Sequence, residues 1–424
     1  MKKNILVFPC GSEIALEIYR SLKYSTHFNL IGGNSVDDHG KFIYHEYIGN
    51  LPFVDSDNFI DVIKELVGKK NIDAIYPAMD KVITILKNNE NIIGCKIISS
   101  PKETVEICLS KSKTYKILDS VINVPQLYKL EEIVTFPVFA KPDIGYGSRG
   151  TKLISDSLSL NDYSNNYPNS IYCEYLDGEE YTVDCFTDRY GELRFSAPRL
   201  RRRIMNGVSV NTIPIKDDEN EFKNEIIKIN EKIRFRGAWF AQFKRNKKGK
   251  LTLLEIASRL GGSSSLYRNK GINFALLSLY DAFNMDIEII ENNYEIELDR
   301  ALDNKYKVNI KYNEIYIDFD DCILLNKTSL NVQALSFIFQ CINDNKKVTL
   351  LTRHSGEIET ILKKYKILDI FDEIIHIKDG KPKSSYIKNK NSIFVDDSFA
   401  ERKEVQKSTG IPVFSTDMIE SLLD

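Results

Sequence analysis

The stretch Trp239–Gly262 reads WFAQFKRNKKGKLTLLEIASRLGG and decides the fold of the middle of the chain. Two apolar runs flank a polar segment, which predicts a β-hairpin. With the turn centred between Lys248 and Gly249, Gln242 lies directly opposite Glu255. Directly opposed residues share one face of a sheet, so these two side chains can converge on one Mg²⁺, an ion that takes oxygen ligands. The alternative is a buried polar pair between two strands.

A glycine-rich loop follows an apolar strand earlier in the chain. Lys141 ends the predicted strand 138–141, and Gly145, Gly147 and Ser148 lie in the loop after it. Backbone N–H groups of such a loop can approach phosphate oxygens while the lysine supplies positive charge. The alternative is a flexible hairpin loop beside a surface lysine.

An acidic segment between two predicted strands can bind the rest of a nucleotide. It runs from Glu174 to Asp184 and includes Glu180. An adenine needs backbone donors and acceptors, and a ribose needs a carboxylate; this segment can offer both.

The densest basic cluster of the chain is formed by Arg199, Arg201, Arg202 and Arg203. Guanidinium groups bind carboxylates and phosphates through paired hydrogen bonds. On a regular strand Arg201 and Arg203 share one face, which predicts a site for an anionic substrate. A solvated run of charges is the alternative.

Residues suited to phosphate chemistry follow four predicted strands in the last part of the chain. They are Asp318 and Asp320 after the first strand, Thr352 at the end of the second, Lys381 and Lys383 after the third, and Asp396 and Asp397 after the fourth. Open α/β sheets hold ligands at the carboxyl ends of their strands. Acids for Mg²⁺, a hydroxyl and a lysine for phosphate therefore predict a phosphoryl site.

Residues 1 to about 300 resemble the ATP-grasp superfamily. The resemblance is carried by Lys111, Lys141, the glycine loop, Glu180 and the run from Leu254 to Gly262. It implies that both lysines hold ATP phosphates, that the glycine loop closes over them, and that Glu180 binds the ribose. It also implies that Glu255 binds Mg²⁺ and that Arg259 faces the substrate or an acyl phosphate.

Two departures from the ATP-grasp pattern concern the metal. Ala257 stands where many members have Asn, and Gln242 stands where a carboxylate is common. Fewer charged ligands weaken Mg²⁺ binding.

Residues 312–424 are similar to the haloacid-dehalogenase (HAD) phosphatase superfamily. The resemblance implies that Asp318 is the nucleophile and Asp320 the general acid–base. It also assigns phosphoryl binding to Thr352 and Lys383, with Lys381 as the alternative to Lys383. The carboxylates to which it assigns Mg²⁺ binding are Asp318, Asp320, Asp396 and Asp397. The short segments between the motifs leave no room for a cap domain. His354 is interpreted as an exposed loop histidine, with a place at the phosphatase mouth as the alternative.

Composition excludes other classes of protein. The 424 residues carry 58 Lys and Arg against 60 Asp and Glu, without the basic excess of a general nucleic-acid binder. Seven cysteines are scattered singly, which predicts reduced thiols and a cytoplasmic location. No apolar stretch approaches the ~20 residues that span a bilayer, so no membrane partner is expected.

We therefore expect an α/β and α+β multidomain protein. Its predicted domains are a Rossmann-like domain at 1–100, an ATP-grasp domain at 101–305, and a capless, doubly wound HAD-like domain at 312–424. The expected activity is an ATP-dependent carboxylate–amine ligase with an acyl-phosphate intermediate, coupled to a Mg²⁺-dependent phosphomonoester phosphatase. The alternatives are an ATP-grasp kinase without an amine step and a nucleotide-binding scaffold whose only catalyst is the phosphatase. Expected partners are a small carboxylate and an amine, or a phosphorylated metabolite; a homodimer is left open.

Overall fold

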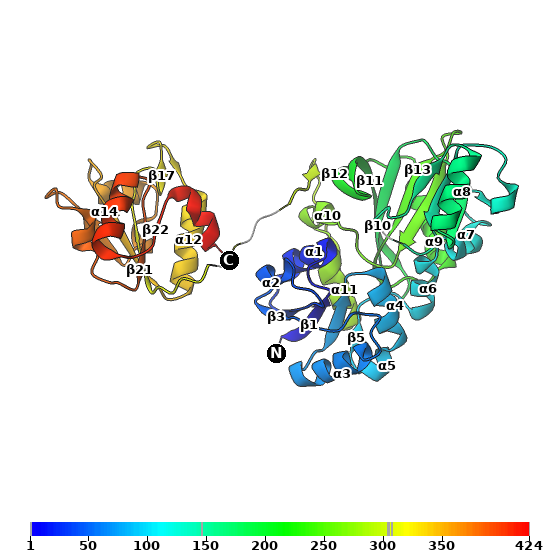
Figure 1. Cartoon of the computed structure of the whole chain (residues 1–424), viewed down its shortest axis with the longest axis horizontal. Coiled ribbons are helices and arrows are strands. Elements are labelled where there is room, and N and C mark those ends of the chain that lie inside the picture. The colour runs from blue at the N-terminus through cyan, green and yellow to red at the C-terminus, as the bar shows by residue number, and fades with distance from the viewer. Residues whose placement is uncertain (1, 146, 303–305, 307, 424) are drawn as a thin grey trace. The chain divides into compact units, whose positions relative to one another are not determined.

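Figure 1 shows the computed structural model of the chain, which describes residues 2–145, 147–302, 306 and 308–423. The chain divides into two compact units, Met1–Leu302 and Asp303–Asp424. Among the described residues, no helix is long and apolar enough to cross a membrane.

The first unit begins with a parallel sheet covered by helices. Its strands, in the order β3-β2-β1-β4-β5, are β1 Lys3–Phe8, β2 Phe28–Gly33, β3 Glu46–Ile48, β4 Ala74–Pro77 and β5 Lys96–Ile97. Parallel neighbours need crossover connections, and the helices there are α1 Glu13–Leu22, α2 Gly40–Ile43, α3 Phe59–Lys70, α4 Asp80–Asn88 and α5 Glu90–Ile93. Side chains alternate between the faces of a strand, so Val7 packs with α1 while Leu6 packs with α3 and α4.

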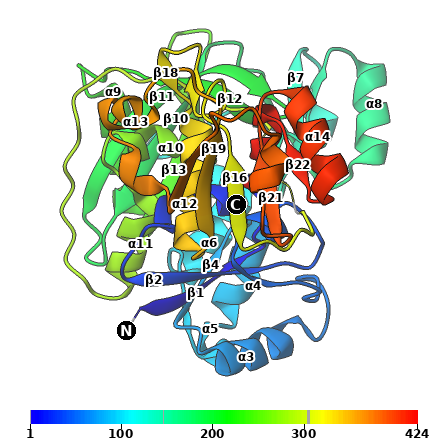
Figure 2. The same cartoon turned by 90° about the vertical axis from the view of Figure 1, so that its left-hand side faces the viewer.

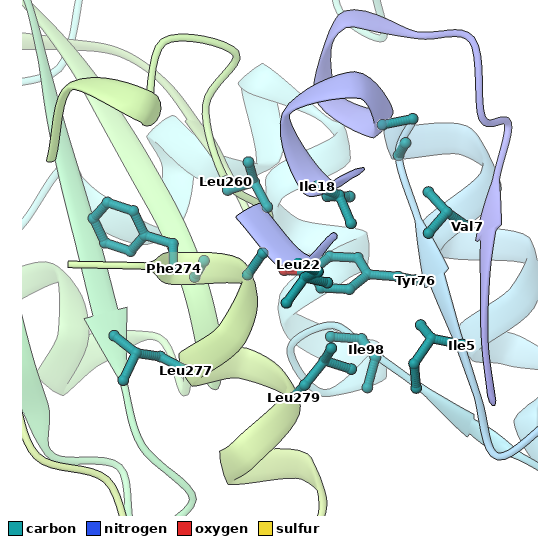
Figure 3. Packing of buried hydrophobic residues seen from close by; sticks show 14 of the residues in the cluster. Ile5, Val7, Ile18, Leu22, Tyr76, Ile98, Leu260, Phe274, Leu277 and Leu279 are labelled. Carbon is teal, nitrogen blue, oxygen red and sulfur yellow. The ribbon is translucent and has the colours of Figure 1, made fainter. Parts of the chain in front are cut away.

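One apolar cluster joins this sheet to residues that come much later in the chain. In Figure 3, Ile18 and Tyr76 lie between Val7 on one side and Leu260 and Phe274 on the other; Phe274 is the first residue of α11 (Phe274–Ala282). The predicted boundary near residue 100 therefore lies within one compact unit, and the division of that unit into two domains stays a prediction.

A four-stranded antiparallel sheet carries the glycine loop. Its strands, in the order β6-β9-β7-β8, are β6 Leu127–Tyr128, β9 Ser170–Glu174, β7 Val138–Pro142 and β8 Lys152–Ile154. Helices α6 Lys102–Leu109 and α7 Lys111–Leu118 precede it, and α8 Ser157–Asn166 lies between β8 and β9.

A six-stranded antiparallel sheet forms the rest of the first unit. Its strands, in the order β14-β13-β10-β11-β12-β15, are β14 Leu251–Ala257, β13 Gly237–Arg245, β10 Glu180–Thr187, β11 Leu193–Met205, β12 Val208–Pro214 and β15 Leu298–Asp299. Helix α9 (Glu221–Lys232) packs on one face through Phe222, Ile226 and Ile229, together with Trp239 of β13. Helix α10 (Ser265–Asn269) follows β14. The opposite face of this sheet carries the candidate site.

The hairpin β13–β14 confirms the predicted pairing of Gln242 with Glu255. Nearer the turn the partners are Phe243 with Leu253, because the register shifts between Gln242 and Phe243. Leu254 is thus the extra residue of a β-bulge, a feature common beside active sites. The turn is centred half a residue earlier than predicted. The extra residue of the bulge compensates for this offset, so Gln242 and Glu255 are paired as predicted.

The second unit is a five-stranded parallel sheet with helices on both faces. Its strands, in the order β20-β19-β16-β21-β22, are β16 Glu314–Ile317, β19 Lys347–Thr352, β20 Glu373–His376, β21 Ser392–Val395 and β22 Val413–Phe414. Helices α12 (Val332–Asn343) and α13 (Ile358–Lys364) cover one face, and α14 (Phe399–Thr409) covers the other (Figure 2). A small hairpin, β17 Leu324–Leu325 and β18 Ser329–Leu330, follows the first strand. The four strands that the sequence predicts before the phosphate-chemistry residues are β16, β19, β20 and β21.

Candidate functional sites

A first cavity lies between the four-stranded and the six-stranded sheet. Its lining includes every residue to which the sequence assigns nucleotide or metal binding in this unit: Lys111, Lys141, Gly145, Gly147, Ser148, Glu174, Glu180, Gln242 and Glu255. These residues come from α7, β7, the glycine loop, β9, β10 and the β13–β14 hairpin. The structure therefore brings this set together around one space.

Lys141 is held rigidly at the wall of the first cavity. Its buried ammonium donates to Tyr115 Oη at 2.7 Å and to the carbonyl of Leu254 at 3.3 Å. Tyr115 Oη in turn donates to the same carbonyl at 2.5 Å. The bulge explains this arrangement, because the extra residue of a bulge is left outside the sheet's hydrogen bonding. An ammonium has three donors, so these bonds leave one N–H for a ligand.

Lys111 is tied to the base of the glycine loop. Its Nζ donates to the carbonyls of Gly145 at 3.2 Å and Asp143 at 3.4 Å. Burial lowers the pKa of Lys111 and the nearby charge of Lys141 acts in the same direction, while Glu255 opposes both. Two cations at one wall make this cavity suited to a polyanion.

Glu255 is an open carboxylate of the first cavity. Among the residues that the structure describes, none forms a hydrogen bond or an ion pair with its side chain. Gln242 beside it accepts from Arg201 Nη1 at 3.0 Å. An unpaired carboxylate and an amide oxygen on one sheet face fit a hard ion that takes oxygen ligands. In the described part of this unit, no group of three acidic, histidine or cysteine side chains is close enough to hold a metal ion by itself.

Glu180, the predicted ribose ligand, is already in contact with a cation. It forms an ion pair with Arg201, whose Nη2 also donates to the carbonyl of Gly207 at 2.8 Å. Burial lowers the pKa of Arg201, and Glu180 counteracts that effect. Arg201 thus stands at the border between the first cavity and a second one.

The second cavity, of about 840 Å³, shares with the first a wall that includes Gly147, Arg201 and Glu255. The tip of the β11–β12 hairpin touches the glycine loop there: a Cβ on Gly207 would lie 2.5 Å from Ser148 Oγ. Gly207 also has a φ of +77°, which favours glycine. The two cavities are therefore neighbours divided by two loops.

Arg259 lines the second cavity, as the resemblance implies. Its Nε and Nη2 each lie 2.8 Å from one carboxylate oxygen of Asp80, the first residue of α4. Burial disfavours the charged guanidinium, but Asp80 outweighs this effect and raises the pKa of Arg259. The guanidinium lies 5.4 Å from the ring centre of Phe240. The sequence patterns did not indicate Asp80, although its place shortly after a strand of the parallel sheet is a signal.

The prediction that Arg203 shares a face with Arg201 is wrong. The register shifts between them, so Arg201 pairs with Thr212 while Arg203 pairs with its neighbour Asn211. Consecutive residues of a strand point to opposite faces, and Arg203 is exposed in an ion pair with Asp299 at 2.8 Å. It lines neither cavity. Arg199 stays at the second cavity, where it is buried beside Asp184 at 2.6 Å.

The second unit holds a buried cluster of charges at the carboxyl ends of its strands. Lys383 Nζ lies 2.8 Å from Asp318 Oδ1 and 2.6 Å from Asp396 Oδ2. Burial raises the pKa of Asp318 to about 6, with Lys383 opposing and Asp396 adding to the shift. Burial lowers the pKa of Lys383, but the two acids outweigh it and the net shift is upward.

Three of the side chains there are close enough to hold one ion. The ligand atoms of Asp318, Cys322 and Asp397 lie within 4.8 Å of one another. Burial raises the pKa of the Cys322 thiol, so it remains protonated and is a poor partner for Mg²⁺. The two carboxylates fit the ion, whereas Asp320 and Asp396, also predicted as ligands, lie outside this group.

His354 is not the exposed loop residue that the sequence suggested. Its side chain is 12% exposed, and Nδ1 lies 3.0 Å from both carboxylate oxygens of Asp320. Its backbone N–H donates to Thr352 Oγ1 at 3.2 Å, and its carbonyl accepts from His376 Nε2 at 2.7 Å. His354 therefore links the predicted acid–base to the predicted phosphoryl-binding hydroxyl. Its position two residues after Thr352 was the available signal.

Comparisons with known proteins bear on the first unit. Residues 166–303 match the family described as "ATP-grasp in the biosynthetic pathway with Ter operon". Solved structures with the same arrangement extend the likeness over 69% of the chain. The chain contains an ATP-grasp fold.

Three solved structures illustrate the likeness. One is the biotin carboxylase domain of 2-oxoglutarate carboxylase from Hydrogenobacter thermophilus, in complex with MgADP, ADP and bicarbonate. Its sequence is 17% identical, the match covers 69% of this chain and 72% of that chain, and the TM-score is 0.58. N5-carboxyaminoimidazole synthetase from Staphylococcus aureus is 16% identical, with coverages of 69% and 81% and a TM-score of 0.57. L-Amino acid ligase from Bacillus licheniformis is 16% identical, with coverages of 69% and 75% and a TM-score of 0.56. A search of curated protein sequences found no significant match. At this identity the likeness concerns the fold alone.

Proposed function

We propose that the ATP-grasp part of this chain is an ATP-dependent carboxylate–amine ligase. The observation that carries the proposal is the convergence of Lys111, Lys141, the glycine loop, Glu180 and Glu255 on one cavity beside an arginine-lined one. Two lysines and backbone donors suit the phosphates of ATP, and Glu180 suits its ribose. Mg²⁺ bound by Glu255 and Gln242 would neutralise phosphate charge.

The reaction divides between the two cavities. A carboxylate oxygen held near Arg259 attacks the γ-phosphorus of ATP, the bond to the bridging oxygen breaks, and ADP leaves. The nitrogen of an amine then attacks the carbonyl carbon of the acyl phosphate, loses a proton, and expels phosphate to leave an amide. Arg259 is fixed by Asp80 on one side and by Phe240 beneath it, so it can orient the reacting carboxylate without moving.

The test is ADP formation by the whole chain with panels of carboxylates and amines, with products identified by mass. The proposal expects ADP only when a carboxylate is present and an amide only when both are. A phosphorylated acceptor formed without any amine would favour an ATP-grasp kinase. ATP that binds but is never turned over would favour a nucleotide-binding scaffold.

A second activity is favoured by the buried cluster of the other unit, which we propose is a capless HAD-type phosphatase. Asp318 Oδ attacks phosphorus, the bond from phosphorus to the ester oxygen breaks, and Asp320 protonates that oxygen as the alcohol leaves. Asp320 then takes a proton from water, whose oxygen attacks phosphorus; the bond from phosphorus to Asp318 breaks, which frees inorganic phosphate and the Asp318 carboxylate. Lys383, between Asp318 and Asp396, offers positive charge to the phosphoryl oxygens. Mg²⁺ held by Asp318 and Asp397 would lessen the repulsion between two anions.

The phosphatase is tested with aryl phosphates and by mass spectrometry after rapid quenching. The proposal expects a phosphoryl group on Asp318 in the intact chain and none in Asp318→Asn. A phosphoryl group on another residue, or full activity in that variant, contradicts the assignment.

A further inference from the structure

Three buried polar atoms at the second cavity have no hydrogen-bond partner among the described residues. They are Thr182 Oγ1, Arg199 Nη1 and Arg201 Nε. The exposed fractions of these residues are 1%, 3% and 9%. Native proteins leave few buried polar groups unpaired, and each exception calls for a cause such as an ion or ligand.

The three residues lie together on one face of the six-stranded sheet. Thr182 of β10 is directly opposite Arg199 of β11, and Arg201 is two positions further along β11, before its register shift. All three line the second cavity. The three residues therefore belong to one wall of that cavity.

Acidic partners hold the two guanidinium groups in place without using all their donors. Arg199 Nε donates to Asp184 at 2.6 Å. Arg201 contacts Glu180 and Gln242 through Nη1 and donates through Nη2 to the Gly207 carbonyl at 2.8 Å, which leaves its Nε without a partner among the described residues. The remaining N–H groups are thus pre-oriented, which lowers the entropy lost when a ligand binds.

Gly261 lies next to Arg199 and, having no side chain, leaves room for its guanidinium group. A Cβ on Gly261 would lie 3.1 Å from Arg199 Nη2 and 3.2 Å from Asp184 Oδ1. The loop that carries Arg259 can therefore pass close to this ion pair without displacing it. Any larger residue there would press on the guanidinium.

We propose that Thr182, Arg199 and Arg201 form an oxyanion subsite, which holds an acidic group of the substrate that does not react. A hydroxyl and two guanidinium donors suit a carboxylate or a phosphate, whose oxygens accept several hydrogen bonds. That the ligand is a ligase substrate rests on the proposed function; the subsite itself does not.

The position of the subsite separates it from the reacting carboxylate. Glu255, Gln242, Thr182 and Arg199 occupy one row across four neighbouring strands. Strands are spaced about 4.8 Å apart, so the backbones at Thr182 and Arg199 are about 10 and 14 Å from that at Glu255. A reacting group must come within about 3–3.5 Å of the phosphorus. The substrate therefore carries a second acidic group, set back from the one that is activated.

The test measures the binding of inorganic phosphate and of acetate to the whole chain, without ATP, at constant ionic strength. The two anions distinguish a phosphate-type from a carboxylate-type subsite. Thr182→Val keeps the shape of the side chain and removes only the hydroxyl. Loss of one hydrogen bond to a charged group is expected to weaken binding of the preferred anion by about tenfold or more.

Thermal unfolding without anion gives a second readout. Because the Thr182 hydroxyl is buried and unpaired, Thr182→Val should unfold at the same or a higher temperature than the parent. The matched control is Thr187→Val on the same strand, where the hydroxyl accepts from Trp239 at 2.9 Å and donates to Asn230 at 2.8 Å. That variant should unfold at a lower temperature and bind the anion normally. Gly261→Ala, which crowds Arg199, should weaken anion binding as Thr182→Val does.

Three results would overturn the subsite. The first is that neither anion binds the parent chain more tightly than it binds Thr182→Val. The second is that Gly261→Ala leaves the affinity unchanged. The third is that Thr182→Val unfolds at a lower temperature than the parent, which would mean that the hydroxyl has a structural partner. Failure of ATP turnover would bear on the proposed ligase alone.

Discussion

Replacing Lys141 with methionine isolates the contribution of one buried cation to nucleotide binding. The ammonium makes two hydrogen bonds inside the protein, to Tyr115 Oη and to the Leu254 carbonyl. After the replacement Tyr115 Oη still donates to that carbonyl, so no buried polar atom loses its only partner. The free energy of unfolding should therefore change by less than about 1 kcal/mol. A hydrogen bond to a charged group is worth about 1.5–3 kcal/mol, so the Kd of ATP should rise about ten- to a hundredfold.

The assay is isothermal titration of the whole chain with ATP in Mg²⁺. Lys152→Met is the matched control, because Lys152 lies on the neighbouring strand opposite Ala140 and is 45% exposed in a 3.4 Å ion pair. It should bind ATP like the parent. An unchanged ATP affinity in a folded Lys141→Met variant, or equal losses in both variants, would refute the reasoning.

Three further predictions concern the two sites. Glu255→Gln should abolish Mg²⁺-ATP turnover and leave hydrolysis of an aryl phosphate nearly unchanged; parallel loss of both activities in a folded variant would contradict two separate sites. Asp318→Asn should unfold at a higher temperature than the parent above pH 6 when metal is removed. In the folded parent the pKa of Asp318 is raised from its ordinary 3.8 to about 6. The stability that this group contributes is therefore fully present below pH 4 and is lost as the pH rises through 6. Calorimetry should show a higher unfolding temperature for Asp318→Asn than for the parent at pH 8 and equal temperatures at pH 4. His354→Asn, which retains a donor near the Nδ1 position, should hydrolyse alkyl phosphates faster than His354→Leu. Equal rates would mean that the contact between His354 and Asp320 does not position Asp320 for catalysis.

The hairpin shows how far sequence patterns reach. Alternation and the polar turn were enough to pair Gln242 with Glu255, and the pattern of strands followed by polar residues was enough to place four strands of the second unit. The same alternation failed at Arg203, because a register shift after Arg201 changes which face the next residue occupies. A bulge depends on local backbone geometry that a pattern of residue types does not encode.

Contacts between segments that are far apart in the sequence were the other feature that the sequence patterns could not predict. Asp80 meets Arg259 although 179 positions separate them, and neither local pattern indicates the other. His354 looked exposed because a loop residue shows no periodicity, yet Phe319 and Asp320 from another strand end enclose its ring. Residues at the carboxyl ends of strands were predictable as a set, whereas the pairs that they form were not.

The most direct test of the ligase follows the oxygen atoms of the substrate. The whole chain is incubated with ATP, Mg²⁺, an amine and a carboxylate labelled with ¹⁸O in its carboxyl group, using a pair that supports ADP release, and the released phosphate is analysed by mass. An acyl phosphate transfers one carboxyl oxygen to phosphate when the amine displaces it, so the account predicts one ¹⁸O in the phosphate and an amide in equal amount. ADP released with unlabelled phosphate would mean that water or another acceptor receives the phosphoryl group, and would contradict the account.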